Sequence, residues 1–307
     1  MVGKEWMNMM NQLSKHKTIL LLVFLVIMWG VNWPLTKIGL RYAPPLLFAG
    51  LRTLIGGIIL LLLALPRYKS LRLKETWPIY VMSALLNIVL YYGLMTFGLL
   101  YTPAGLFSAI VFLQPVLLGV FSWIWLGESM YARKMIGLLL GFVGVSIICA
   151  FGIIGHASGL GIALAIGTAL SWAFGTVYMK RISDRVDSLW VISLQQTIGG
   201  LLLTGSGAVI ENWTEISWNL TFISNLLFIS IFVIALGWLT YFVLLGSGEA
   251  SKVGAFTFLI PLISNVVSVV FLHEEFTWNL VVGLVFILFS IYLVNVKSRQ
   301  GSSLAAG

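Results

Sequence analysis

Apolar residues fill this chain in ten long runs that are separated by short polar connections. Each run holds about 20 residues, the length of helix that crosses the hydrocarbon core of a bilayer. The runs cover residues 18–40, 45–65, 77–99, 104–126, 133–152, 158–180, 188–210, 221–245, 250–272 and 276–296. The pattern therefore predicts an all-α integral membrane protein with ten transmembrane helices.

The polar stretches between these runs are short. The longest are residues 1–17, 66–76 and 211–219. None is long enough to fold as a separate domain, which excludes a soluble catalytic module, a receptor ectodomain and an ATPase cassette. The first run has no small-residue cleavage site after it, so we expect an uncleaved span rather than a signal peptide.

The composition indicates that most of the protein surface faces lipid, and it offers few side chains for catalysis or metal binding. Hydrophobic residues make up 60% of the chain and charged residues 9%, whereas soluble proteins carry about 25% charged residues. The single cysteine, Cys149, excludes a disulfide framework and a cysteine metal site. The stretch Gly159-Leu160-Gly161 lacks the third glycine of a dinucleotide-binding loop. We therefore expect no cofactor, no metal and no enzymatic activity.

Lysine and arginine residues gather on one side of the predicted membrane. Fifteen of the 18 fall in segments on the N-terminal side, only Lys37 and Arg41 fall on the other side, and Arg52 lies inside the second run. Cytoplasmic connections carry such an excess, so both termini are expected in the cytoplasm, in a bacterial-type plasma (inner) membrane. The net charge of +8 then reflects topology and does not indicate a nucleic-acid partner.

The two halves of the chain resemble each other. A shift of 146 residues aligns 104–140 with 250–286 at 11 identities in 37 positions, and a shift of 143 aligns Trp29 with Trp172. Each half, 18–152 and 158–296, then holds five spans, and this odd number inverts the second half; residues 1–17 and 297–307 form cytoplasmic ends. Inverted repeats are typical of secondary transporters, whose halves rock around a central site.

Several motifs resemble a known family. Trp29-Gly30-Val31-Asn32-Trp33-Pro34 is similar to the opening of the drug/metabolite transporter superfamily, EamA type, and Leu126-Gly127-Glu128 is similar to the end of its fourth span. Leu272-His273-Glu274 resembles the second copy of that motif, with His273 in place of the glycine. The resemblance covers residues 18–296 and implies a ten-helix carrier that exports amino acids or other small metabolites.

One cation lies within the hydrocarbon region, where charge is costly and usually functional. Arg52 occupies the second run, and Gln195 holds the matched position in the second half. Two interpretations remain open. The guanidinium contacts an anionic group of the substrate, such as a carboxylate, or its long side chain extends to the outer headgroups or pairs with carbonyls at a helix end.

Two prolines and two glutamates recur at matched positions. Pro115 and Pro261 lie in the middle of spans, where proline removes a hydrogen bond and leaves the carbonyls of Val111 and Thr257 under-satisfied. They are candidate hinges, or else static kinks. Glu128 and Glu274 end matched spans on opposite sides of the membrane, either as gates that cap neighbouring helices or as solvated interfacial groups.

Aromatic and amide side chains within the runs are candidates for lining a solute cavity. Aromatic walls with few polar groups suit a small, partly apolar solute, although aromatic residues also anchor span ends. Buried amides need partners, so Gln196 and Asn265 should also face the interior. The candidate substrate-binding residues are Arg52, Trp29, Asn32, Trp33, Asn87, Tyr91, Tyr92, Gln114, Trp172, Thr176, Gln195, Trp238 and Tyr241.

These features together indicate an alternating-access carrier for a small-molecule substrate, with membrane lipids around it; whether it is a monomer or a homodimer stays open. Amino acids, aromatic or apolar ones first, are the expected solutes. A flippase of a lipid-linked substrate is one alternative, and a lipid-modifying enzyme is a weaker one because no acidic, histidine or nucleophile cluster is present. No acidic residue lies in the middle of a span, so we expect transport without proton coupling.

Overall fold

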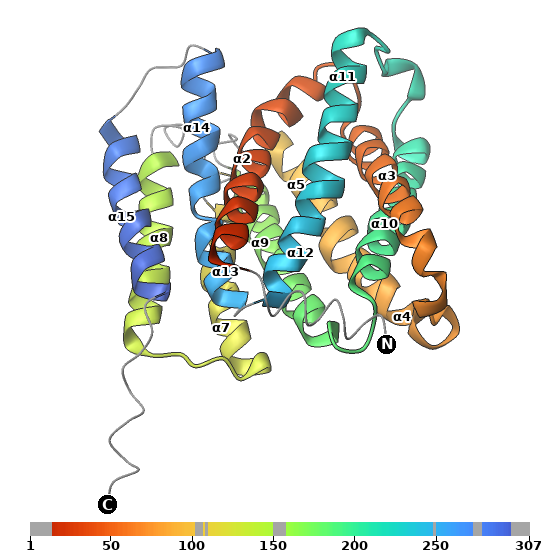
Figure 1. Ribbon diagram of the computed structural model, residues 1–307. Helices are drawn as coiled ribbons and strands as arrows, with labels where there is room; N and C mark the ends of the chain where they lie inside the picture. The colour runs from red at the N-terminus through yellow and green to blue at the C-terminus, as the bar shows by residue number, and fades with distance from the viewer. Residues whose placement is uncertain are drawn as a thin grey trace, which may run out of the picture.

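The computed structural model describes residues 14–101, 107, 110–149, 158–247, 250–272 and 278–295, and every structural statement below concerns these residues. Nearly all of them are helical and stand side by side in one bundle (Figure 1). The first half contains α2 (Lys15–Gly39), α3 (Pro45–Ala64), α4 (Leu73–Ala84), α5 (Tyr91–Tyr101), α7 (Gln114–Leu126) and α8 (Ala132–Cys149). The second half contains α9 (Gly159–Ile182), α10 (Ser188–Ile210), α11 (Leu220–Phe228), α12 (Gly237–Ser247), α13 (Ala250–Phe256), α14 (Leu259–Leu272) and α15 (Trp278–Asn295).

Five helical stretches in the described chain are long and apolar enough to cross a membrane unaided. They are His16–Thr36, Pro45–Ser70, Leu73–Gly98, Gly159–Ile182 and Leu220–Ser247. Shorter apolar helices occupy Gln114–Leu126, Ala250–Ser264 and Val281–Asn295. The expected all-helical membrane fold is confirmed, and several of the predicted spans are built from two helices in tandem.

Two spans contain a π-helical stretch at matched places. Residues Leu85–Leu90 join α4 to α5, and residues Ile229–Leu236 join α11 to α12. The shift of 146 residues places the first stretch on the second. Each stretch offers a backbone carbonyl to the first helix of the other half. The Ser171 hydroxyl of α9 donates to the Leu86 carbonyl at 2.5 Å, and the Trp29 indole of α2 donates to the Val233 carbonyl at 3.3 Å.

The matched prolines follow breaks in their helices. α7 begins at Gln114 directly before Pro115, and α13 and α14 are separated by a turn before Pro261. The expected interruption of both spans is therefore confirmed. The expectation that the Thr257 carbonyl is left under-satisfied is wrong, because the Ile260 N–H donates to it at 3.0 Å across three residues.

The halves enter the bundle from opposite ends. At one end of the bundle, named the basic end, α2 and α8 begin and α9 finishes (Figure 1), and the chain there carries Arg67, Lys134 and Lys180. α9 begins at the opposite end, where the Ser158 N–H donates to the carbonyl of Tyr101 at the end of α5. At the basic end, the Lys180 ammonium donates to the Leu245 carbonyl, so α9 and α12 finish together.

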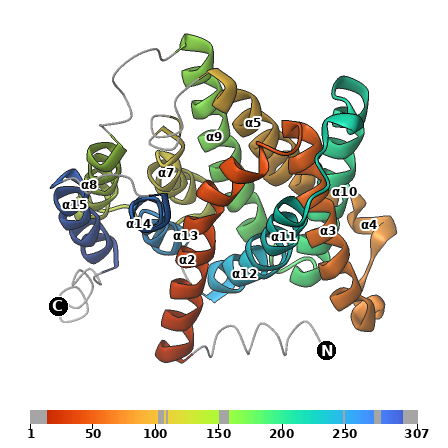
Figure 2. The ribbon, with the colours of Figure 1, turned by 90° about the horizontal axis from the view of Figure 1, so that it is seen from above.

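Equivalent helices of the two halves pair through glycine. α3 packs against α10 on one side of the bundle, and α8 packs against α15 on the other (Figure 2). A Cβ atom on Gly57 would lie 2.6 Å from the Thr197 nitrogen, and one on Gly200 would lie 2.6 Å from the Leu54 nitrogen. The shift of 143 residues exchanges these two contacts, so the pairing is symmetric. The remaining helices enclose the space between the two pairs.

Candidate substrate pocket

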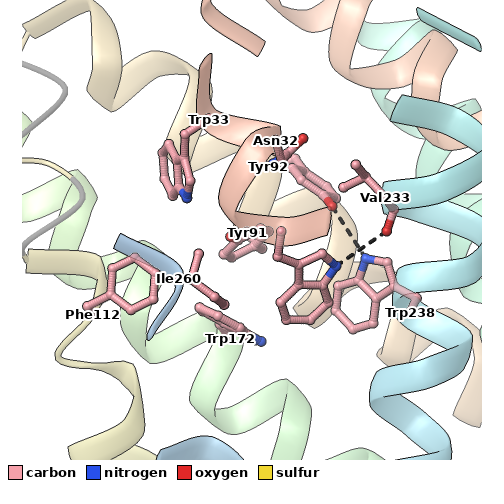
Figure 3. A pocket seen from close by; sticks show the side chains of 10 residues that line it. Asn32, Trp33, Tyr91, Tyr92, Phe112, Trp172, Val233, Trp238 and Ile260 are labelled. Atoms are coloured by element: carbon pink, nitrogen blue, oxygen red, sulfur yellow. Dashed lines mark hydrogen bonds between the residues drawn. The ribbon is translucent and has the colours of Figure 1, made fainter. Parts of the chain in front are cut away.

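A pocket lies between the two halves at the centre of the bundle. Its cavity volume in this conformation is about 30 Å³, room for little more than a water molecule. Seven of the residues predicted to bind substrate line it, and Phe112, Val233 and Ile260 complete its wall (Figure 3). The seven are Trp29, Asn32, Trp33, Tyr91, Tyr92, Trp172 and Trp238. The walls therefore come from both repeats and are mainly aromatic.

Trp29 stands at the middle of this aromatic cluster. Its ring centroid lies 5.6 Å from that of Trp172 and 5.7 Å from that of Trp238, so the repeat-related Trp29 and Trp172 meet across the pocket. Trp238 donates to the hydroxyl of Tyr92 at 3.4 Å, and these two residues are also related by the repeat. Aromatic side chains in contact at such separations hold one another in place. The pocket wall is thus fixed from both halves.

Arg52 lies one layer behind the wall. Its side chain is 1% exposed, and its guanidinium lies over the rings of Phe48 and Tyr92 at 5.2 and 5.0 Å. This burial excludes the alternative in which Arg52 extends to the outer headgroups. The guanidinium donates to the Thr36 hydroxyl at 2.7 Å, and that hydroxyl contacts the Asn32 amide oxygen at 3.3 Å. Arg52 therefore reaches the pocket through Thr36 and Asn32.

Tyr241 and Thr176 lie next to the pocket without lining it. The Tyr241 ring centroid is 5.0 Å from that of Trp29, and its hydroxyl is 3.1 Å from the Thr176 hydroxyl. Both residues lie closer to the basic end than Trp238 and Trp172 do, because α9 and α12 finish there. They support the aromatic cluster from the side opposite to Arg52.

The predicted amides face the interior. Asn87, Gln114, Gln195 and Gln196 are all buried. The Asn87 amide nitrogen donates to the Gln195 side-chain oxygen at 3.4 Å, which joins the π-helical stretch after α4 to α10. The Gln114 side chain interacts with the Tyr241 hydroxyl, whereas neither amide atom of Gln196 has a hydrogen-bond partner in the described chain. The side chain of Asn265 lies outside the described residues.

The profile of the EamA-like transporter family matches the chain twice, over residues 16–150 and 159–296. The chain belongs to the EamA-like transporter family. It is 63% identical over 298 residues to the uncharacterized transporter YvbV of Bacillus subtilis, covering 97% of this chain and 98% of that protein. It is 27% identical over 306 residues to a probable amino-acid metabolite efflux pump of Escherichia coli, covering 91% and 94%.

A solved structure shares the architecture of this EamA-like transporter. The two superpose with a TM-score of 0.80 at 20% sequence identity, over 92% of this chain and 97% of the other. At that identity the likeness concerns the fold alone. The family and the fold together make the protein a multi-pass membrane transporter built from two repeats.

Glu128 of this EamA-like transporter joins the end of α7 to the beginning of α13. Its carboxylate accepts hydrogen bonds from the Ala250 N–H at 2.6 Å, from the Ser251 N–H at 3.4 Å and from the Ser251 hydroxyl. The Lys134 ammonium lies 3.4 Å from it. A carboxylate at the N-terminus of a helix satisfies its free N–H groups. Glu128 is therefore a cap and not a solvated interfacial group, while Glu274 lies outside the described residues.

Three lining residues were missed by sequence reasoning, and the repeat points to two of them. Val233 occupies the position that matches Asn87, and Ile260 the position that matches Gln114. Amides were selected as candidates because burying them is costly, whereas their apolar partners gave no such signal. Phe112 lies two residues before Gln114 in the turn that precedes α7.

Proposed function

We propose that this EamA-like transporter exports small metabolites, amino acids first among them, by alternating access through the central pocket. The observation that carries the proposal is a pocket walled by aromatic rings from both halves with one amide, Asn32, on its wall. Such a wall suits a solute with an apolar body and one polar end. The two halves that wall the pocket are related by the repeat, and in transporters built from inverted repeats one half moves against the other.

The charges around the pocket favour an amino acid over a dianion or a simple cation. Arg52 is the buried cation beside the pocket, and no carboxylate lines the pocket. An ammonium group would then lie against the faces of Trp29, Trp172 and Trp238, which attract cations. The orientation with both termini in the cytoplasm, the hinge role of Pro115 and Pro261 and the gate role of Glu128 and Glu274 belong to the same proposal.

Counterflow in liposomes tests the proposed function directly. Purified protein in vesicles loaded with one unlabelled amino acid should accumulate the same labelled amino acid, with phenylalanine and leucine ahead of lysine and glutamate. Trp172→Leu should raise the KM about tenfold, while Trp125→Leu, whose ring is exposed at the far end of α7, should leave it unchanged. Absence of counterflow with every amino acid overturns the substrate class, and movement of a fluorescent lipid would favour the flippase alternative.

Transport should proceed without a proton gradient. In the described chain, the aspartates and glutamates lie at helix ends and connections, and both Glu128 and Glu211 accept N–H groups of neighbouring helices. No carboxylate among them is free in the middle of a span to carry a proton. With a pH gradient imposed across the vesicles, adding a protonophore should therefore leave the initial rate of amino-acid uptake unchanged. A rate that collapses with the gradient would contradict the expectation.

A further inference from the structure

Asn32 is the one amide among the residues that line the pocket, beside the hydroxyls of Tyr91 and Tyr92, and its oxygen contacts a neighbouring hydroxyl. It lies beside Tyr92 on the wall, away from Trp172 (Figure 3). Its Oδ1 atom lies 3.3 Å from the Thr36 hydroxyl, one helical turn further along α2. Its Nδ2 atom has no hydrogen-bond partner in the described part of the chain. The hydrogen bonds among Arg52, Thr36 and Asn32 determine which atoms of the Asn32 amide are available to a solute.

Arg52 fixes which groups donate and which accept in these two hydrogen bonds. A guanidinium donates hydrogen bonds and accepts none, so the 2.7 Å contact from Arg52 Nη1 uses the Thr36 hydroxyl as an acceptor. The single proton of that hydroxyl is then free to be donated to Asn32 Oδ1. The oxygen of the amide is occupied, and its two N–H groups remain for the pocket. Arg52 and Thr36 therefore make Asn32 a donor.

The charge of Arg52 adds to this arrangement. The guanidinium is buried, and in the described chain no carboxylate lies within 4.0 Å of it. A buried cation without a counter-charge is costly. Hydrogen bonds donated by an ion are stronger than neutral ones, and they also strengthen the hydrogen bonds that follow them in a network. An anionic acceptor placed in the pocket would receive the Asn32 N–H groups and lower the cost of the buried charge.

We infer that Asn32 binds the carboxylate of a monocarboxylate substrate and that Arg52, through Thr36, is the positioning residue for that contact. The inference rests on the proposed function and names the group of the substrate that the pocket selects. It differs from a direct contact between Arg52 and substrate, because Tyr92 and Asn32 stand between the guanidinium and the pocket. The apolar body of the substrate then lies along the same aromatic wall that faces its ammonium group.

Removing the Thr36 hydroxyl, which lies between Arg52 and Asn32, tests the inference. Thr36→Val keeps the shape of the side chain and leaves Arg52 charged, but it frees the Asn32 amide to rotate. The affinity for phenylalanine should fall about 10- to 100-fold, the range expected for a hydrogen bond to a charged group. The affinity for phenylalaninamide, which has no carboxylate, should change little. Thr36→Ser should restore the preference for the acid.

A neighbouring threonine provides the matched control. Thr53 is also buried beside Arg52 in sequence, but its hydroxyl donates to the Ala49 carbonyl of its own helix at 2.6 Å. Thr53→Val should leave both affinities unchanged. An unchanged ratio of acid to amide affinity in Thr36→Val would overturn the inference. Unfolding temperatures of all variants separate loss of binding from loss of fold.

A second variant and a second ligand keep the two proposals distinguishable. Asn32→Asp replaces the donor by an acceptor of the same size, so binding of phenylalanine should be lost and binding of phenethylamine retained. Wild-type protein that binds 3-phenylpropionate but moves no amino acid would contradict the proposed solute class and support the carboxylate contact. Wild-type protein that binds phenethylamine better than either acid would overturn the carboxylate contact.

Discussion

Alanine at Gly57 and Gly200 is expected to leave little folded transporter in detergent. Each new Cβ atom would lie 2.6 Å from a backbone nitrogen of the partner helix, and a backbone atom cannot rotate away as a side chain can. Helices in membranes are held together largely by such close packing. α3 and α10 would have to separate along their length, at a cost of about 1–3 kcal/mol for each substitution.

The unfolding temperature of each purified variant measures this effect. Gly205 is the matched control, because it lies on α10 and a Cβ atom there would meet nothing within 4 Å. Gly205→Ala should unfold at the wild-type temperature or slightly above it, since alanine favours a helix over glycine by about 0.5–1 kcal/mol. Equal stability of the Gly57, Gly200 and Gly205 variants would contradict the packing described for α3 and α10.

Replacing Glu128 by alanine should destabilise the basic end of the bundle. The substitution removes the acceptor of the Ala250 and Ser251 N–H groups and takes away the carboxylate beside Lys134, whose side chain is 0% exposed. Losing one partner of a buried ion pair costs about 3–5 kcal/mol. We therefore expect a lower unfolding temperature and reduced counterflow, because the end of α7 is no longer tied to the beginning of α13.

Two variants make this measurement specific. Glu128→Gln keeps an acceptor oxygen and should lose less stability than Glu128→Ala. Glu215→Ala removes an exposed carboxylate whose one side-chain hydrogen bond within the described residues comes from the Asn212 amide, and it should unfold as the wild type does. If Glu128→Ala were as stable as Glu215→Ala, the cap would contribute nothing to the fold.

The sequence predicts the architecture well because lipid imposes a simple rule on it. Helices that satisfy their own backbone groups are required wherever the chain crosses hydrocarbon, so apolar runs translate directly into helices. The same reasoning selected Trp29, Trp172 and Trp238 as lining residues, and the repeat superposes Trp29 on Trp172 and Tyr92 on Trp238. The π-helical stretches had no signal in the apolar pattern, because each is apolar except for one residue, Asn87 or Ser230, and a change of helical register leaves that composition unaltered.

The sequence pattern could not predict which residues line the pocket and which lie behind its wall. Arg52 stood out as the single cation in an apolar run, but only the structure places Tyr92 and Asn32 between it and the pocket. Thr36 was not among the candidate binding residues, because the hydroxyl of a threonine in a helix usually donates to a carbonyl of its own helix. Its role depends on a contact between α2 and α3 that no local spacing encodes.

The matched π-helical stretches also bear on how the chain arose. A π-helical stretch accommodates an extra residue within a helix, and here one occurs before Tyr91 and another before Gly237, at equivalent points of the two halves. The simplest history is a single insertion in an ancestral five-helix protein, followed by duplication and fusion of its gene. A present-day five-helix relative that assembles as an antiparallel dimer would then be expected to carry the same insertion.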